Sequence, residues 1–328
     1  MLIEEFVIVM FENLYGLSCI ENQTLAILRE HGMDIRPLYR DCAMPVKELF
    51  FFLIYHGNKQ EYFDRITRVQ DLARELGIIS MELCGRPAGE KVETRRPFPG
   101  AAPVGEYTLP PKENADLGEM MNAVRNVAKN EYILARVTEE FTKVQLHGRG
   151  LRDDHYVRVM ANGDTFDILN DIPEITLSLT AEDFSAAYGG DFFKLRVNRD
   201  ISDTDREKIH AARVFKAENH NEFFFDITDF DPIRRFPNEP EDAGIRMRNM
   251  AGVYKTLRHR LAEYYGQYTD TGFILERMPE AEKYYSVFEY YNLKKNISFE
   301  RYFEVFEKLN DLDNELMKAL KTGLKGSV

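Results

Sequence analysis

The chain has 328 residues, of which 44% are hydrophobic and 30% are charged, and its formal net charge is −12. This length supports one large or two modest domains with a sizeable core, and the composition is ordinary for a globular protein. The acidic balance argues against a general nucleic-acid binder, which needs a basic face.

The first predicted elements are a strand over residues 3–10 and a helix that begins at Cys19. The stretch Met1-Leu2-Ile3-Glu4-Glu5 is acidic and lacks the basic start and long apolar run of a signal peptide. The longest apolar run, 49–55, is too short to span a bilayer. Three cysteines without a paired motif fit a reducing compartment. We therefore expect a cytoplasmic protein without a membrane partner.

Cys19 is the most informative residue. It lies in Gly16-Leu17-Ser18-Cys19-Ile20-Glu21, where Ser18 and Glu21 form a capping-box pattern that places Cys19 in the first helical turn. The positive end of the helix dipole and the free backbone N–H groups favour a thiolate there. The sequence thus predicts a nucleophilic thiol on a helix that ends near Gly32.

The next segments are mainly helical. We predict a buried helix over 46–55, an amphipathic helix over 60–76 that stops at Gly77, and a helix over 116–129. Between the last two, residues 86–112 contain six of the thirteen prolines. That density predicts a long irregular loop, either a lid or a mobile insertion.

Strands then take over. We predict strands over 132–137, 155–160, 165–169 and 192–197, with a short helix between the last two that begins at Thr180 and ends at Gly189-Gly190. Asn162-Gly163 is a hairpin turn signal. Helices follow at 203–215, 242–265, 279–290 and 299–320. We therefore predict two domains, residues 1–198 and a helical C-terminal domain or cap over 199–328.

A cysteine, a histidine and an Asn-Asp pair follow one another in an order that suggests nucleophilic catalysis. Cys19 is followed 136 residues later by His155, at the start of a strand, and the next strand ends in Asn170-Asp171. A nucleophilic thiol, a base and a residue that orients the base occur in this order in papain-like folds. The predicted fold class is therefore α+β, with a nucleophile helix packed on an antiparallel sheet. The alternative is that Cys19 is a small buried side chain and His155 a strand residue with a satisfied hydrogen bond.

Two roles in this arrangement stay open. Side chains alternate along a strand, so Asn170 and Asp171 are not both expected to face the histidine. We prefer Asp171 as the orienting residue, with Asn170 as the alternative. Asn13 precedes Cys19 by six residues, and its amide either joins the Cys19 N–H in an oxyanion hole or is a turn residue.

Other polar residues suggest weaker roles. His147 and Arg149 lie in a loop and either contact substrate or are surface residues, while Cys42 and Cys84 are predicted to be structural. Arg95-Arg96 and Arg234-Arg235 are candidate docking points for an acidic partner, or simply solvated surface. No phosphate-binding loop and no His/Glu cluster with metal spacing is present, so we expect no metal.

The segment Phe11-x-Asn13-x-Tyr15-Gly16-x-x-Cys19-Ile20 resembles the N-terminal signature of the butirosin biosynthesis protein H family, papain-like proteins related to C39 peptidases. The strand at 132–137, His155-Tyr156-Val157 and Asp171-Ile172-Pro173 are similar to the second half of that domain. The resemblance covers roughly residues 10–198. The chain departs from the C39 pattern in having Asn13 instead of Gln, and Ile172 between Asp171 and Pro173.

This resemblance implies an acyltransferase of specialised-metabolite biosynthesis. The namesake of the family takes an acyl group from an acyl carrier protein thioester and places it on an amine of an aminoglycoside. Carried over, Cys19 is the nucleophile, His155 the base and Asp171 the orienting residue. The implied partners are an acyl carrier protein or peptidyl carrier domain, which brings its own phosphopantetheine, and a small-molecule acceptor; no further cofactor is implied.

The sequence therefore predicts a thiol-dependent acyltransferase that forms an acyl-enzyme on Cys19. A cysteine hydrolase, either a peptidase or a thioesterase, would use the same three residues and release free acid without an acceptor. A binding protein on the same fold would have an unreactive Cys19.

Overall fold

The computed structural model of the chain describes residues 14–39, 46, 49, 69–85, 91–92, 107–108, 117–146, 155–218, 240–294 and 299–326. Contacts between residues divide the chain at Ile35/Arg36, Arg68/Val69 and Ile201/Ser202 into two compact units. Unit 1 holds a sheet with helices on it, and unit 2 is helical. The chain is thus a mixed α+β protein.

The boundaries of these units differ in one respect from the predicted domains. The end of unit 1 at Ile201 lies close to the predicted boundary at 198. Segment 36–68, which we predicted within the first domain, belongs to unit 2. The reason is local packing, because the 3-10 turn η1 (Arg36–Leu38) buries Pro37 and Leu38 and contacts the unit 2 helices α8 and α10.

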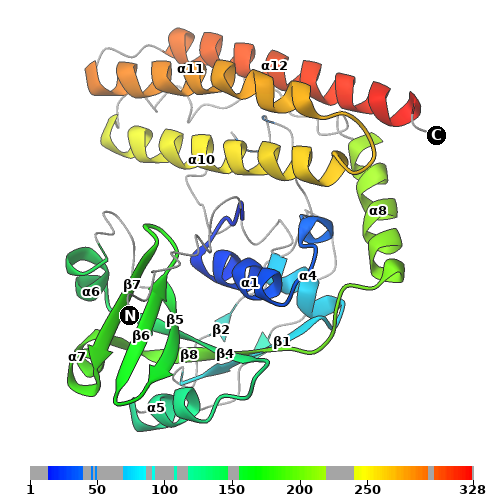
Figure 1. Cartoon of the computed structure of the whole chain (residues 1–328). Coiled ribbons are helices and arrows are strands. Elements are labelled where there is room, and N and C mark those ends of the chain that lie inside the picture. Colours follow the sequence, from blue (N-terminus) through cyan, green and yellow to red (C-terminus); the bar gives the residue numbers. More distant parts are fainter. Residues whose placement is uncertain are drawn as a thin grey trace, which may run out of the picture. The chain divides into compact units, whose positions relative to one another are not determined.

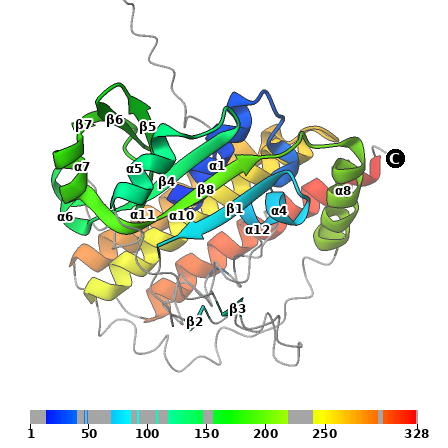
Figure 2. The same cartoon turned by 90° about the horizontal axis from the view of Figure 1, so that it is seen from below.

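Unit 1 is built around a six-stranded sheet in which every neighbouring pair is antiparallel (Figures 1 and 2). The strand order is β1-β8-β4-β5-β6-β7. The strands are β1 (Ile79–Cys84), β4 (Glu131–Val137), β5 (His155–Asn162), β6 (Thr165–Asn170), β7 (Ile175–Thr180) and β8 (Tyr188–Val197). The predicted strands at 132–137, 155–160, 165–169 and 192–197 are all present.

The central strand β5 is covered on both faces. Val157 and Val159 belong to an apolar cluster with Met120 and Val124 of helix α5 (Leu117–Arg125). Arg158, which alternates with these valines, instead bonds Glu30 of helix α1 (Cys19–Glu30). Helices α1 and α5 therefore lie on opposite sides of the sheet (Figure 1). The first five residues of β5 are buried as a result.

The hairpin between β5 and β6 confirms the turn predicted at Asn162-Gly163. Asn162 pairs with Thr165 across a two-residue loop, and Gly163 has a φ of 60°. A left-handed backbone at this position is the geometry that Gly adopts without a steric penalty. This turn fixes the register, which aligns Arg158 with Leu169 and so brings the start of β5 close to the end of β6.

Several elements of unit 1 lie outside our predictions. They are the edge strands β1 and β7 and the short helix α6 (Glu139–Val144). Strand β8 also begins at Tyr188, before Gly189-Gly190, where we predicted the end of the helix that is α7 (Ala181–Ala187). Within the predicted irregular loop 86–112, Lys91–Val92 (β2) pairs with Tyr107–Thr108 (β3). The predicted strand at 3–10 lies outside the described residues, as do most of the predicted helix at 46–55 and the first part of that at 60–76, whose end is α4 (Val69–Glu75).

Besides η1, the described part of unit 2 contains the long α-helices α8 (Asp203–Glu218), α10 (Pro240–Tyr265), α11 (Gly272–Lys294) and α12 (Phe299–Gly326). Helix α11 begins seven residues before the predicted start at Pro279, which lies inside the helix and cannot donate the backbone hydrogen bond of its position. Helix α10 packs on α11, and α11 packs on α12. None of the helices that the structure describes is both long enough and apolar enough to cross a membrane.

Candidate active site

The helix that carries Cys19 begins where the capping box predicts, although Glu21 bonds the N–H of Leu17 rather than that of the N-cap residue Ser18. The Ser18 side chain accepts a hydrogen bond from Glu21 N at 3.2 Å. The buried Glu21 carboxylate accepts hydrogen bonds from Leu17 N at 2.6 Å and from Val69 N, the first residue of α4, at 2.9 Å. A single glutamate thus fixes the turn before Cys19 and fastens α1 to α4.

The environment of the thiol opposes its ionisation. Burial, followed by the negative charge of Asp171, raises the pKa of Cys19 from 9.0 to about 12, and backbone N–H groups of Tyr156, Ile20 and Cys19 only partly offset this. The Tyr156 N–H lies 3.4 Å from the Cys19 Sγ. Our prediction of a thiolate favoured by the helix start is therefore wrong for the isolated thiol. A helix terminus contributes only about 0.3–1 kcal/mol, and desolvation outweighs it.

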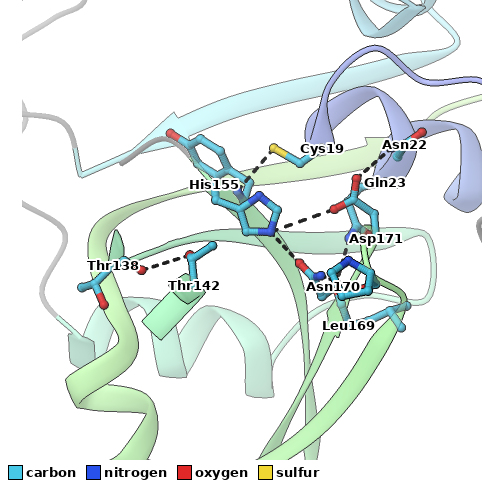
Figure 3. Close-up of polar contacts among 11 residues, drawn as sticks. Cys19, Asn22, Gln23, Thr138, Thr142, His155, Leu169, Asn170 and Asp171 are labelled. Atoms are coloured by element: carbon cyan, nitrogen blue, oxygen red, sulfur yellow. Dashed lines mark hydrogen bonds and ion pairs between the residues drawn. The ribbon is translucent and has the colours of Figure 1, made fainter. Parts of the chain in front are cut away.

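His155 lies beside this thiol, at the first residue of β5 and opposite Val137 of β4. Its ring is buried, and Nε2 lies 2.5 Å from Asn170 Oδ1 (Figure 3). The Asn170 amide is itself fixed, because its Nδ2 donates to the Pro173 carbonyl oxygen at 2.6 Å. Asn170 therefore presents an acceptor to His155, so Nε2 donates in this hydrogen bond and Nδ1 is the ring nitrogen left to face another group.

Asp171 lies farther from the His155 ring than Asn170 does. Its Oδ1 is 4.0 Å from His155 Nε2, and its Oδ2 accepts a hydrogen bond from Asn22 Nδ2 at 2.8 Å. Burial raises the pKa of Asp171, whereas the Asn22 hydrogen bond, the nearby His155 and the backbone N–H groups of Asp171 and Ile172 lower it. Asn170, our alternative for the orienting residue, therefore accepts the direct hydrogen bond from His155. Asp171, which we preferred, is more distant.

The two residues approach the histidine together because the strand ends between them. Asn170 is the last residue of β6, and Asp171 begins a turn. The expectation that only one of them faces His155 is wrong, since alternation applies only while the backbone stays extended.

Two contributors escape the sequence-based prediction. Asn22 and Gln23 are buried on α1, one turn after Cys19, and Gln23 Nε2 donates to the Leu169 carbonyl oxygen at 2.9 Å. The signal was available, because positions three and four residues after Cys19 share its side of the helix. Polar side chains there, within an otherwise apolar stripe, indicate hydrogen-bond partners beside Cys19.

Of the other candidate residues, the structure describes only Cys84. Cys84 is buried in the apolar cluster of unit 1. Asn13, Cys42, His147, Arg149, Arg95-Arg96 and Arg234-Arg235 lie outside the described residues. Within the described ranges no group of three or more His, Cys, Asp or Glu side chains is placed to hold a metal ion.

The arrangement therefore combines a thiol, an imidazole with a defined tautomer, an amide that orients it and a buried carboxylate. The chain was also compared with models of protein families and with curated proteins. Neither comparison found a match.

Proposed function

We propose that unit 1 is a papain-like domain and that the protein is a thiol-dependent acyltransferase, which moves an acyl group from a carrier-bound thioester to an amine or hydroxyl acceptor. The observation that carries the proposal is the His155–Asn170 hydrogen bond of 2.5 Å beside Cys19. The nucleophile comes from a helix, and its base and orienting residue come from two neighbouring antiparallel strands. That combination supports the fold assignment.

The first step is acylation of Cys19. Asn170 engages Nε2, so Nδ1 of His155 takes the Cys19 proton as Sγ attacks the thioester carbonyl. The tetrahedral intermediate then collapses, and the bond between the carbonyl carbon and the carrier sulfur breaks. The carrier leaves as a thiol after receiving the proton from His155. One thioester replaces another, so this step is nearly balanced in free energy.

The second step regenerates the enzyme. An acceptor amine attacks the acyl carbon of the Cys19 thioester, and His155 takes a proton from the amine nitrogen. The bond between the acyl carbon and Sγ breaks, and the proton returns to Sγ. The products are an amide and free Cys19. The raised pKa of the thiol supports this proton-coupled route, because a neutral thiol needs a base at the moment of attack.

We favour acyl transfer over hydrolysis because the segments around Cys19, His155 and Asp171 resemble those of the butirosin biosynthesis protein H family. The proposed partners follow from this resemblance: an acyl carrier protein or peptidyl carrier domain as donor, and a small-molecule acceptor. A hydrolase is the competing outcome, because Cys19, His155 and Asn170 would activate water in the same way.

The test is intact-protein mass spectrometry of the full chain after incubation with a panel of acyl-pantetheine and acyl-carrier thioesters. We expect an acyl mass increment on the wild type that persists in water and disappears when aliphatic amines or aminoglycosides are added. Cys19→Ser removes the increment. Cys84→Ala is the matched control, because it removes a free cysteine of the same unit that lies in the apolar cluster.

The alternatives give different results. Thioester loss that depends on Cys19 without a lasting adduct identifies a hydrolase. If no donor reacts with Cys19, while the Cys19→Ser variant remains folded, the acyltransferase proposal is overturned.

A further inference from the structure

We propose that Asn22 is a positioning residue of this site, which holds Asp171 so that its second carboxylate oxygen stabilises the protonated form of His155. The inference rests on the proposed function, specifically on the transfer of the Cys19 proton to His155. It assigns separate tasks to Asn170 and Asp171, which the sequence offers as alternatives for a single role.

The carboxylate of Asp171 is held asymmetrically. Oδ2 accepts the 2.8 Å hydrogen bond from Asn22, whereas Oδ1 is buried and has no hydrogen-bond partner. A buried carboxylate oxygen without a donor is costly, and native proteins rarely retain one. A group that supplies a positive charge during the reaction would account for it.

His155 is that group. Its Nε2 lies 4.0 Å from the unpartnered Oδ1, while Asn170 occupies the hydrogen-bonding position at 2.5 Å. Asp171 is therefore close enough to attract an imidazolium but is separated from its proton by the Asn170 amide. Asn170 sets the tautomer of the neutral ring, and Asp171 supplies the charge when the ring becomes protonated.

The net effect of that charge depends on which group it acts on more strongly. Figure 3 shows Cys19, His155 and Asp171 grouped together, and one marked interaction of Asp171 is with the His155 ring. The charge of Asp171 repels a thiolate and attracts an imidazolium, and the 4.0 Å separation between Oδ1 and Nε2 makes the attraction strong because Coulomb energy falls with distance. The charged and titratable groups that face Asp171 are His155 and Cys19, and its neutral neighbours are Asn22 and the backbone N–H groups of Asp171 and Ile172. Asp171 thus favours the thiolate–imidazolium pair over the neutral pair.

Asn22 fits this role because it is itself tightly placed. A Cβ on Gly16 would lie 2.0 Å from Asn22 Oδ1, so the turn before the nucleophile packs directly on the amide. Asn22 is 5% exposed, and its backbone N–H bonds the Ser18 carbonyl oxygen at 2.9 Å. The helix start that positions Cys19 therefore also positions the carboxylate behind the base.

The experiment measures alkylation of Cys19 by iodoacetamide across mildly acidic to neutral pH, followed by peptide mass mapping. This probe needs no acyl donor. The variants are Asn22→Ala, Asp171→Asn and the double variant. Gln23→Ala is the matched control, because Gln23 is the adjacent buried amide of α1 and bonds Leu169 rather than Asp171.

We expect Asn22→Ala to slow alkylation by roughly tenfold at mildly acidic pH. In a plot of alkylation rate against pH, the part where the rate falls as the pH is lowered (the acid limb) should move to higher pH. The Asn22 donor favours the charged form of Asp171, so its loss lets Asp171 take up a proton at higher pH. Asp171→Asn removes this limb, and adding Asn22→Ala then changes nothing further. Gln23→Ala leaves the position of the limb unchanged.

A second variant guards against loss of packing at position 22. Asn22→Asp keeps the shape against Gly16, lacks the donor and adds a like charge, so it should move the acid limb further than Asn22→Ala does. Equal shifts for Asn22→Ala and Gln23→Ala, or an undiminished effect of Asn22→Ala in the Asp171→Asn background, would overturn the inference.

The two proposals fail separately. If acyl adducts never form but the alkylation profiles behave as expected, the acyltransferase proposal fails and the role of Asn22 stands. If adducts form on Cys19 but the two substitutions are additive, the function stands and this inference fails.

Discussion

At the scale of single residues, the structure separates the two candidates for orienting the base. Asn170 bonds the ring of His155 directly and is locked by Pro173, whereas Asp171 lies at 4.0 Å. An amide that accepts from Nε2 defines which nitrogen is free to act as a base. An ionised carboxylate in the same place would bond the proton more strongly, and its charge would oppose ionisation of the nearby thiol.

The first prediction concerns Asn170→Ala. The rate of Cys19 alkylation should fall about 10- to 100-fold, because a hydrogen bond to a charged group contributes about 1.5–3 kcal/mol. Asn162→Ala is the control, since Asn162 is an exposed asparagine at the other end of the same hairpin. Comparable rates for the two variants would show that Asn170 does not orient the base.

The second prediction concerns the alkaline range, where an imidazole carries no charge. The charge of Asp171 raises the pKa of Cys19, so Asp171→Asn should lower that pKa from about 12. The ultraviolet absorbance of the thiolate measures this, corrected with the Asp171→Asn/Cys19→Ser double variant for tyrosine ionisation. Asp171→Glu keeps the charge and should retain more of the elevation. An unchanged or higher pKa in Asp171→Asn would contradict the electrostatic account.

At the scale of elements, the site depends on the close fit between α1 and the turn before it. The clearest sign is Gly16, where an added methyl group would lie 2.0 Å from Asn22 Oδ1 and 2.9 Å from Asn22 N. The backbone nitrogen of Asn22 cannot move without shifting helix α1, so a side-chain rotation alone would not remove the clash.

The third prediction follows from that contact. Gly16→Ala should lower the free energy of unfolding by about 1–3 kcal/mol, the usual effect of forcing extra volume into a packed region, and should slow Cys19 alkylation because Asn22 is displaced. Urea unfolding measures the first effect. Gly252→Ala in α10 is the control: its added methyl group meets no atom within 4 Å, and alanine favours a helix interior by about 1 kcal/mol. A neutral Gly16→Ala would refute the proposed fit.

Elements with strong local signals were predictable. The capping box located the start of α1, and Asn162-Gly163 located the hairpin that aligns β5 with β6. The orientation of Asn170 and Asp171 could not be predicted, because it depends on where β6 ends and a turn begins. The pKa of Cys19 could not be predicted either, since burial of the thiol is a property of tertiary packing rather than of helix position.

At the scale of the whole molecule, the chain does not divide as a simple succession of two domains. Segment 36–68 interrupts unit 1 and belongs to unit 2. Part of the cause is the apolar surface of Pro37, Leu38 and Tyr39, all buried, together with Arg260, whose guanidinium lies 5.5 Å from the centre of the Tyr39 ring. Such long-range packing leaves no periodic signal in the sequence. All the described residues of the candidate site nevertheless belong to unit 1.

Unit 2 is held together partly by a buried ion pair. Arg258 of α10 donates two hydrogen bonds to Asp313 of α12, at 2.6 and 2.7 Å, and Tyr254 donates a third at 3.3 Å. Both charged side chains are almost completely buried. Removing one partner would therefore leave a carboxylate without its countercharge in an environment that solvates it poorly.

The last prediction is that Arg258→Met lowers the free energy of unfolding by about 3–5 kcal/mol. Arg277→Met is the matched control on α11, because its bond to Glu280 joins two side chains that are 40% and 41% exposed, and an exposed pair contributes at most about 1 kcal/mol. Under native conditions neither variant should alter Cys19 alkylation, because His155, Asn170 and Asp171 all lie in unit 1. Chemical denaturation and the alkylation assay test both statements. If Arg258→Met costs no more than Arg277→Met, the buried pair does not stabilise unit 2; if it slows alkylation of folded protein, the site depends on unit 2.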